Sequence, residues 1–170
     1  MKLTDIALRL ARRADAPALA AMSRDLIETG LSWHYRPARV AQFLCDPDTV
    51  TVIACDRERT VGFAIMRLPD ERAHIVLLAV RPSHQQSGIG RRMTEWILAS
   101  AAIAGVASVH VELRAGNKAA YALYRAAGFT ETLRLQGYYA GRESAIRMMR
   151  LLRSPGVVPQ AWTPPTLGKR

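Results

Sequence analysis

The order of apolar and polar positions along the chain predicts one domain of strands and helices over residues 1–153. Strands are expected where apolar residues alternate with polar ones or form β-branched runs, and helices where apolar residues recur every three or four positions. The expected strands are residues 5–13, 50–55, 61–68, 73–80, 107–114, 130–139 and 143–152. The expected helices are residues 16–28, 37–44, 91–104 and 118–127.

Two of the expected strands have patterns that bear on function. Residues 73–80 form the most continuously apolar run, which is expected of a central strand covered on both faces. Residues 107–114 alternate cleanly, so that one face of this strand is apolar. The opposite face is polar enough to border a cleft and carries Ser108, His110, Glu112 and Arg114.

Composition indicates a soluble chain with a single core. Hydrophobic residues make up 49% of the 170 residues, and no apolar run reaches the length of about eighteen residues that suggests a membrane span. The first thirteen residues mix acidic and basic side chains where a signal peptide has an apolar segment. We therefore expect a cytoplasmic protein with no membrane partner. Residues 154–170 hold four of the nine prolines and are expected to form an extended or disordered tail.

The spacing of the cysteines and histidines and the distribution of the arginines each argue against one class of site. Cys45 and Cys55 form no C-x-x-C pair, and the four histidines lack the spacing of metal ligands on one helix, so we expect reduced thiols and no metal. The net charge of +10 favours polyanionic partners. Because the arginines are scattered along the chain, we interpret the charge as a basic surface and expect no nucleic-acid substrate.

A glycine loop between an expected strand and an expected helix predicts a phosphate site. Gly88 and Gly90 leave bare backbone N–H groups at a positive helix end, which is where phosphate oxygens bind. The loop lacks the lysine and the hydroxyl residue of a nucleoside-triphosphate loop. Met93 occupies the position of the third glycine in a dinucleotide loop. Neither of those two ligand classes fits.

The same loop resembles a known signature. The pattern Q-x-x-G-x-G, formed by Gln85, Gly88 and Gly90 after the strand HIVLLAV, is similar to the acetyl-CoA signature of the GNAT N-acetyltransferases. VELRAGNKAAYALYRAAGF and QGYYAGRESAIRMM resemble later parts of that family, and more narrowly the bacterial enzymes that acetylate the N-terminal alanine of a small-subunit ribosomal protein. The resemblance implies an α/β fold of three layers, with a mixed, mostly antiparallel central sheet and helices on both faces.

The resemblance also implies acetyl-CoA as co-substrate and a set of residues that bind it. The backbone of residues 78–80 is expected to pair with the pantetheine arm, and the glycine loop is expected to hold the pyrophosphate, with Arg91 and Arg92 able to add bonds to the phosphates. The implied cofactor residues are Leu78, Ala79, Val80, Gln85, Gln86, Ser87, Gly88, Ile89, Gly90, Arg91 and Asn117.

Two residues match the family positions for acid–base catalysis. Glu112 is expected to take the proton of the amine, directly or through a water, and Tyr124 to protonate the departing sulfur. The alternatives are structural: Glu112 pairs with an arginine, Tyr124 packs under the sheet, and Asn117 is only an N-cap. His74 and His110 are the alternative bases. The residues expected to shape the acceptor cleft are Tyr121, Tyr138 and Tyr139.

The acceptor is expected to be an amine of low pKa. An α-amine with a pKa of about 7.7–8.0 is partly neutral at physiological pH, whereas a lysine amine near 10.4 demands more from the base. This favours a peptide N-terminus. The aromatic stretch Trp33–Tyr35 is compatible with an alternative function, a small-molecule acetyltransferase for an antibiotic, a polyamine or an amino acid. The other alternative is a non-catalytic acyl-CoA-binding module. Exposed strands near the C-terminus allow a homodimer.

Overall fold

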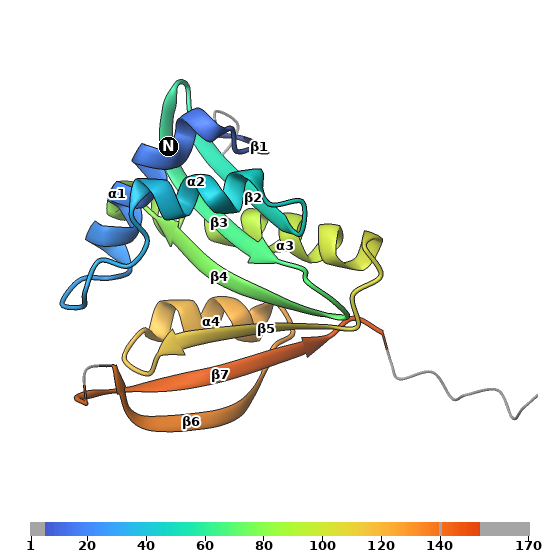
Figure 1. Ribbon diagram of the computed structural model, residues 1–170. Coiled ribbons are helices and arrows are strands. Elements are labelled where there is room, and N and C mark those ends of the chain that lie inside the picture. The colour runs from blue at the N-terminus through green and yellow to red at the C-terminus, as the bar shows by residue number, and fades with distance from the viewer. Residues whose placement is uncertain (1–5, 140, 154–170) are drawn as a thin grey trace, which may run out of the picture.

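The computed structural model describes residues 6–139 and 141–153 and has one sheet with helices on both of its faces (Figure 1). Every strand and helix predicted from the apolar pattern is present, with ends shifted by up to three residues. In chain order the elements are β1 (Ile6–Leu10), α1 (Ala16–Leu26), α2 (Pro37–Cys45), β2 (Thr49–Asp56), β3 (Arg59–Arg67), β4 (Arg72–Val80), α3 (Ile89–Ile103), β5 (Ser108–Arg114), α4 (Lys118–Ala126), β6 (Thr130–Tyr139) and β7 (Glu143–Leu151), with 3₁₀ turns at Arg13–Asp15 and Pro82–His84.

The sheet has seven strands in the order β1-β2-β3-β4-β5-β7-β6 within the described residues. All neighbours are antiparallel except β4 and β5, which run parallel. This parallel pairing is short, extending from Arg72 opposite Ser108 to Ile75 opposite Val111. Beyond it the two strands diverge, and the sheet opens like a V (Figure 1). The fold is therefore the mixed, mostly antiparallel sheet that was predicted.

Two apolar clusters fill the layers on either side of the sheet. On one side α1 and α2 pack through Leu19, Met22 and Val40 against the face that carries Ile53 and Phe63. On the other side α3 and α4 cover the opposite face, and the buried side chains there include Ile89, Met93, Ile97, Tyr124 and Phe129. The helices thus form the outer two of three layers, as predicted.

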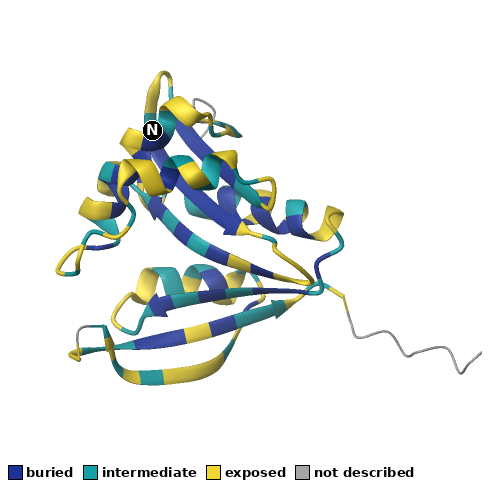
Figure 2. Cartoon of the chain, viewed as in Figure 1, coloured by how far each residue is buried: buried dark blue, intermediate teal, exposed yellow. Residues whose placement is uncertain are grey.

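One prediction about the sheet is confirmed only in part. β4 was expected to be covered on both faces, but its residues alternate, and only Ala73, Ile75, Leu77 and Ala79 are buried. Figure 2 shows this alternation along β4. Val76 packs on the α1–α2 side of the sheet, and Leu78 and Val80 pack on the α3–α4 side, so these residues are half-buried. They keep some exposure because β5 separates from β4 after Ile75 and leaves them on a cavity wall. On β5 the predicted alternation is confirmed, with Val109, Val111 and Leu113 buried.

Several expectations are not decided by the fold. The predicted tail, residues 154–170, lies outside the described residues, and the assignment of residues 1–153 to one domain stays a prediction. β6 forms an edge of the sheet and is largely exposed, which is compatible with the predicted homodimer without testing it. Over residues 6–139 and 141–153, no helix combines the length and the apolar character needed to cross a membrane.

Candidate active site

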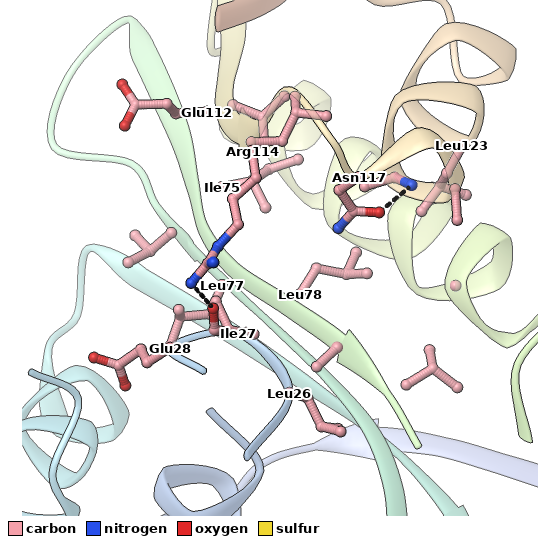
Figure 3. Close-up of a pocket in the computed structure, with 18 of the residues that line it drawn as sticks. Leu26, Ile27, Glu28, Ile75, Leu77, Leu78, Glu112, Arg114, Asn117 and Leu123 are labelled. Carbon is pink, nitrogen blue, oxygen red and sulfur yellow. Dashed lines mark hydrogen bonds between the residues drawn. The ribbon is translucent and has the colours of Figure 1, made fainter. Parts of the chain in front are cut away.

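The divergence of β4 and β5 opens a cavity of about 1330 Å³. β4 and β5 form its back, α4 and residues 84–91 border one end, and residues 26–35 border the other together with Tyr138 and Tyr139. Figure 3 shows Leu77 and Leu78 of β4, Glu112 and Arg114 of β5 and Asn117 around this space. All predicted cofactor residues except Ser87 line the cavity.

The edge of β4 that faces the cavity is free over its second half. β3 pairs with β4 up to Gly62 opposite Val80, whereas β5 pairs with it only up to Ile75. Backbone polar groups of residues 76–80 that point away from β3 therefore face the cavity, and the carbonyl of Val80 is the one that already accepts from a side chain, that of Gln85. A free strand edge is a template for hydrogen bonds with an extended ligand. This geometry suits the predicted role of residues 78–80.

The glycine loop leads from β4 into the N-terminus of α3. Gly88 is the N-cap residue of α3 and has φ +79°, a left-handed conformation that glycine adopts without the steric cost of a Cβ. Gln85 stabilises the loop, since its Nε2 donates to the carbonyl of Val80 at 2.9 Å, and the hydroxyl of Ser87 donates to the carbonyl of His84. Ser87 thus points back into the loop. The first amides of a helix have no partner within it, so this helix end can bind an anion.

The two arginines that follow the loop differ in position. Arg91 lines the cavity, and its Nε donates to Glu95 at 2.8 Å one turn later. Arg92 does not line it, because Nη1 of Arg92 donates to the carbonyl of Ile6 in β1 at 3.1 Å. Successive residues on a helix point about 100° apart, which follows from 3.6 residues per turn and separates the two side chains. In this conformation Arg91 is therefore the one of the two arginines that lies beside the predicted phosphate site.

Glu112 lies on the cavity side of β5 and is paired with an arginine. Its Oε2 accepts a hydrogen bond from Nε of Arg147, 2.9 Å away on the neighbouring strand β7. The side chain of Glu112 is 19% exposed and that of Arg147 is 47% exposed. An ion pair with such an accessible partner is weak and readily exchanged. Glu112 therefore pairs with an arginine, as its structural alternative predicted. This exposed pair leaves the carboxylate accessible to a ligand in the cavity.

Tyr124 lies on α4 and is buried while it lines the same cavity. Its ring packs edge to face on Phe129, with the ring centroids 5.3 Å apart. Burial raises the pKa of the Tyr124 hydroxyl above its usual value of about 10, so the group stays protonated at neutral pH. A protonated hydroxyl on a cavity wall is able to donate a proton. Packing and proton donation are therefore compatible at this residue.

Asn117 is both the N-cap residue of α4 and a residue of the cavity wall. Its Oδ1 accepts from the backbone amide of Ala120 at 3.0 Å, which confirms the predicted N-cap of α4 (Figure 3). The residue also lines the cavity. Because the cap uses only the oxygen of the amide group, its NH₂ group remains available to a ligand.

The family of the chain follows from comparison with known proteins. The family model described as Acetyltransferase (GNAT) family matches residues 19–129. The chain belongs to this GNAT acetyltransferase family. The N-alpha-acetyltransferase RimI of Mycobacterium tuberculosis is 34% identical to this chain over 143 residues, which are 81% of this chain and 87% of that protein.

Two further GNAT comparisons involve Escherichia coli. The [Ribosomal protein bS18]-alanine N-acetyltransferase of strain K12 is 38% identical over 93 residues, and this match spans 53% of the chain and only 63% of that relative's length. The crystal structure of the ribosomal-protein-S18-alanine N-acetyltransferase from the same species has a TM-score of 0.78 and 26% identity, covering 90% of this chain and 97% of the other.

Of the alternative bases and the cleft tyrosines predicted for this GNAT chain, some line the cavity and others do not. His74 lines the cavity, whereas His110 lies outside it, with Nε2 2.9 Å from Oγ of Ser108. Burial lowers the pKa of both imidazoles, which favours their neutral form. Tyr138 and Tyr139 line the cavity as expected. Tyr121 does not, and packs against the apolar core instead.

The aromatic stretch before α2 is only partly at the site. His34 and Tyr35 line the cavity. Trp33 is not among the lining residues, because its ring packs against the arginine side chains of Arg24 and Arg36, whose Cζ atoms lie 5.4 and 5.6 Å from the ring centroid. Among the described residues there is also no group of three or more His, Cys, Asp or Glu side chains that could hold a metal ion.

The sequence did not reveal the contacts that two charged residues of the cavity wall make. Glu28 was placed inside a helix, but α1 ends at Leu26, and the buried carboxylate of Glu28 accepts from the amide of His34 at 2.6 Å. Arg114 is predicted on the face of its strand that borders a cleft, and the structure adds that it reaches the carbonyl of Ile27 (Figure 3). Their roles depend on segments distant in sequence, and no local pattern indicates such contacts.

Proposed function

We propose that this protein is an N-acetyltransferase that moves the acetyl group of acetyl-CoA to the α-amine at a protein N-terminus. One observation carries the proposal. A single cavity contains a free strand edge, a helix N-terminus able to bind phosphate, a carboxylate at Glu112 and a buried hydroxyl at Tyr124. Membership of the GNAT family supports the reaction, and the names of the E. coli and M. tuberculosis relatives support this class of acceptor.

The cavity fits acetyl-CoA in outline. An extended pantetheine arm suits the free edge at residues 78–80, and the pyrophosphate suits the loop from Gln86 to Arg91 at the start of α3. In this pose Arg91 would exchange its surface pair with Glu95 for a phosphate contact. Bound acetyl-CoA supplies an activated thioester near Glu112 and Tyr124. The residues of the chain then have to bind it, orient the amine and move two protons.

The left-handed backbone at Gly88 yields a prediction about this binding. Gly88→Ala places a Cβ on a residue at φ +79°, which costs roughly 1–2 kcal/mol unless the loop changes shape. A changed loop re-aims the amides that hold the pyrophosphate, so we expect the Kd for acetyl-CoA to rise about tenfold. Calorimetric titration measures it.

The matched control for Gly88→Ala is Gly105→Ala. Gly105 follows α3 at its other end, has φ +77°, and has no atom within 4 Å of the position where a Cβ would stand. It should lose a similar amount of stability with an unchanged Kd for acetyl-CoA. Equal Kd values for both variants would show that the loop does not bind the cofactor in the proposed way.

The proposed reaction is direct transfer. Glu112, acting directly or through a water, accepts a proton as the amine nitrogen bonds to the acetyl carbon. As the carbon–sulfur bond breaks, the hydroxyl of Tyr124 gives its proton to the sulfur, so that CoA leaves as the thiol. Glu112 then releases its proton to solvent and Tyr124 recovers one from solvent, which restores both groups. No covalent bond to the enzyme is needed.

The charges at the acceptor end favour an α-amine over a polyamine. Of the described residues that line the cavity, Glu28 and Glu112 are the acidic ones, and both already have partners. Glu28 binds the hydroxyl of Ser23 and the amide of His34, and Glu112 binds Arg147. A polycationic acceptor needs unpaired carboxylates to replace its hydration. The described lining supplies two arginines beside these two glutamates, so it has no excess of negative charge for a polycation.

A panel of amines tests the proposed acceptor class. Release of CoA is followed with peptides that begin with alanine or serine, the same peptides blocked at the N-terminus but containing lysine, spermidine and an aminoglycoside. We expect turnover of the free N-terminal peptides, because their amine is partly neutral at pH 7. Faster turnover of spermidine or the aminoglycoside would replace this proposal by the small-molecule alternative. Binding of acetyl-CoA without turnover of any amine would favour the non-catalytic module.

A further inference from the structure

Arg114 makes an unusual set of contacts at the end of β5. Its Nη1 donates to Oε2 of Glu143 at 3.1 Å, and its Nη2 donates to the carbonyls of Ile27 and Thr29 at 3.0 and 2.8 Å. The guanidinium carbon also lies 5.4 Å from the ring centroid of Tyr139. One side chain thus joins three segments that are far apart in sequence.

These segments lie on opposite sides of the open sheet. Ile27 and Thr29 follow α1, in the layer that packs on β2, β3 and β4. Glu143 begins β7, and Tyr139 ends β6, on the side beyond β5. β4 and β5 no longer pair at this level of the sheet. The bonds of Arg114 therefore replace the missing strand pairing and connect the two sides of the cavity (Figure 3).

The segment that Arg114 contacts is tied to α1, since the amides of Ile27 and Glu28 donate to the carbonyl of Ser23, and Arg114 links it to β5. Residues 27–36 form no strand or helix, and they include the cavity-lining residues His34 and Tyr35. Glu28 holds the far part of this segment through the amide of His34, while Arg114 holds the near part through two carbonyls. Loss of the guanidinium leaves the near part of the segment without its link to β5.

We propose that Arg114 is a positioning residue that fixes the separation between residues 27–35 and the Tyr138–Tyr139 end of β6, and so sets the shape of the acceptor end of the cavity. This inference rests on the proposed function for its effect on an acceptor. A guanidinium suits the role because its planar fork offers donors in two directions. A lysine ammonium at the same place reaches either Glu143 or the two carbonyls, but not all of them.

The test compares Arg114→Met with Arg92→Met. Arg92 is a matched control because it also donates to a backbone carbonyl far away in sequence, that of Ile6, and lies outside the cavity. Both variants should lower the melting temperature. Only Arg114→Met is expected to raise the KM of an alanine peptide, by about tenfold or more, with the KM of acetyl-CoA within about twofold of the wild type. Arg114→Lys should restore the peptide KM only in part.

Hydrogen exchange separates this inference from the proposed function. Whatever the protein acetylates, Arg114→Met should speed amide exchange in residues 27–35 and 139–143, and Arg92→Met should not. Unchanged exchange there, or equal rises in the KM of peptide and acetyl-CoA, would overturn the positioning role. Faster exchange in a protein that acetylates no peptide would support the positioning role of Arg114 and refute the proposed function instead.

Discussion

Tyr124→Phe is expected to lower kcat by about 100-fold with little change in the KM of acetyl-CoA, because it removes the proton donor and keeps the ring. The edge-to-face contact with Phe129 and the burial of the ring are retained. The melting temperature should therefore stay close to that of the wild type. Steady-state release of CoA at saturating peptide, with a thermal melt of the same sample, measures both quantities.

The matched control for Tyr124→Phe is Tyr121→Phe, one turn earlier on α4. Tyr121 packs against the core but does not line the cavity, so loss of its hydroxyl should leave kcat unchanged. Because burial raises the pKa of Tyr124, its hydroxyl stays protonated as the pH rises through 9, and kcat should show no fall there from loss of the acid. A kcat of Tyr124→Phe within about threefold of the wild type would remove this residue from the mechanism.

Glu112→Gln is expected to lower kcat/KM for the peptide by about 100-fold at pH 7, since the amine then lacks its proton acceptor. The defect should shrink as the pH approaches 9, because an α-amine with a pKa of about 8 loses its proton to solvent there. A pH profile of kcat/KM from 6 to 9.5 for the variant and the wild type measures this change.

Arg147→Met separates a catalytic role of Glu112 from its ion pair. This variant breaks the same 2.9 Å contact but retains the carboxylate, so it should keep its activity within about threefold. If the pair itself were what mattered, both variants would lose activity to the same extent. Because the Arg147 side chain is 47% exposed, loss of the pair should leave the melting temperature of either variant close to that of the wild type.

The strands and helices could be predicted from the sequence because their signals are local. Alternation on β5, the cap at Asn117 and the glycines that end α3 and α4 each act over a few residues. The exposure of part of β4 to a cavity could not be predicted in this way. Val76, Leu78 and Val80 are as apolar as core residues, and only the separation of β4 from β5 leaves them on a cavity wall.

Only part of the candidate site could be predicted from the sequence as well. Residues 85–91 were found through the glycine-loop motif, and Glu112 and Tyr124 through the resemblance of the segments after it to the GNAT family. Their proposed roles remain predictions, and the structure adds that most of them share one cavity. The contacts of Glu28, Arg114 and Arg147 were missed because their partners are brought together only by the tertiary fold. Such residues carry no local signal that distinguishes them from surface charges.

The most direct test of the central claim is the mass of an alanine-initiated peptide after incubation with purified protein and acetyl-CoA. The account predicts a single acetyl group on the α-amine, formed together with one equivalent of free CoA and greatly reduced in Tyr124→Phe. An unmodified peptide, in a protein that a thermal melt shows to be folded and that does not bind acetyl-CoA, would contradict the claim that this cavity carries out acetyl transfer.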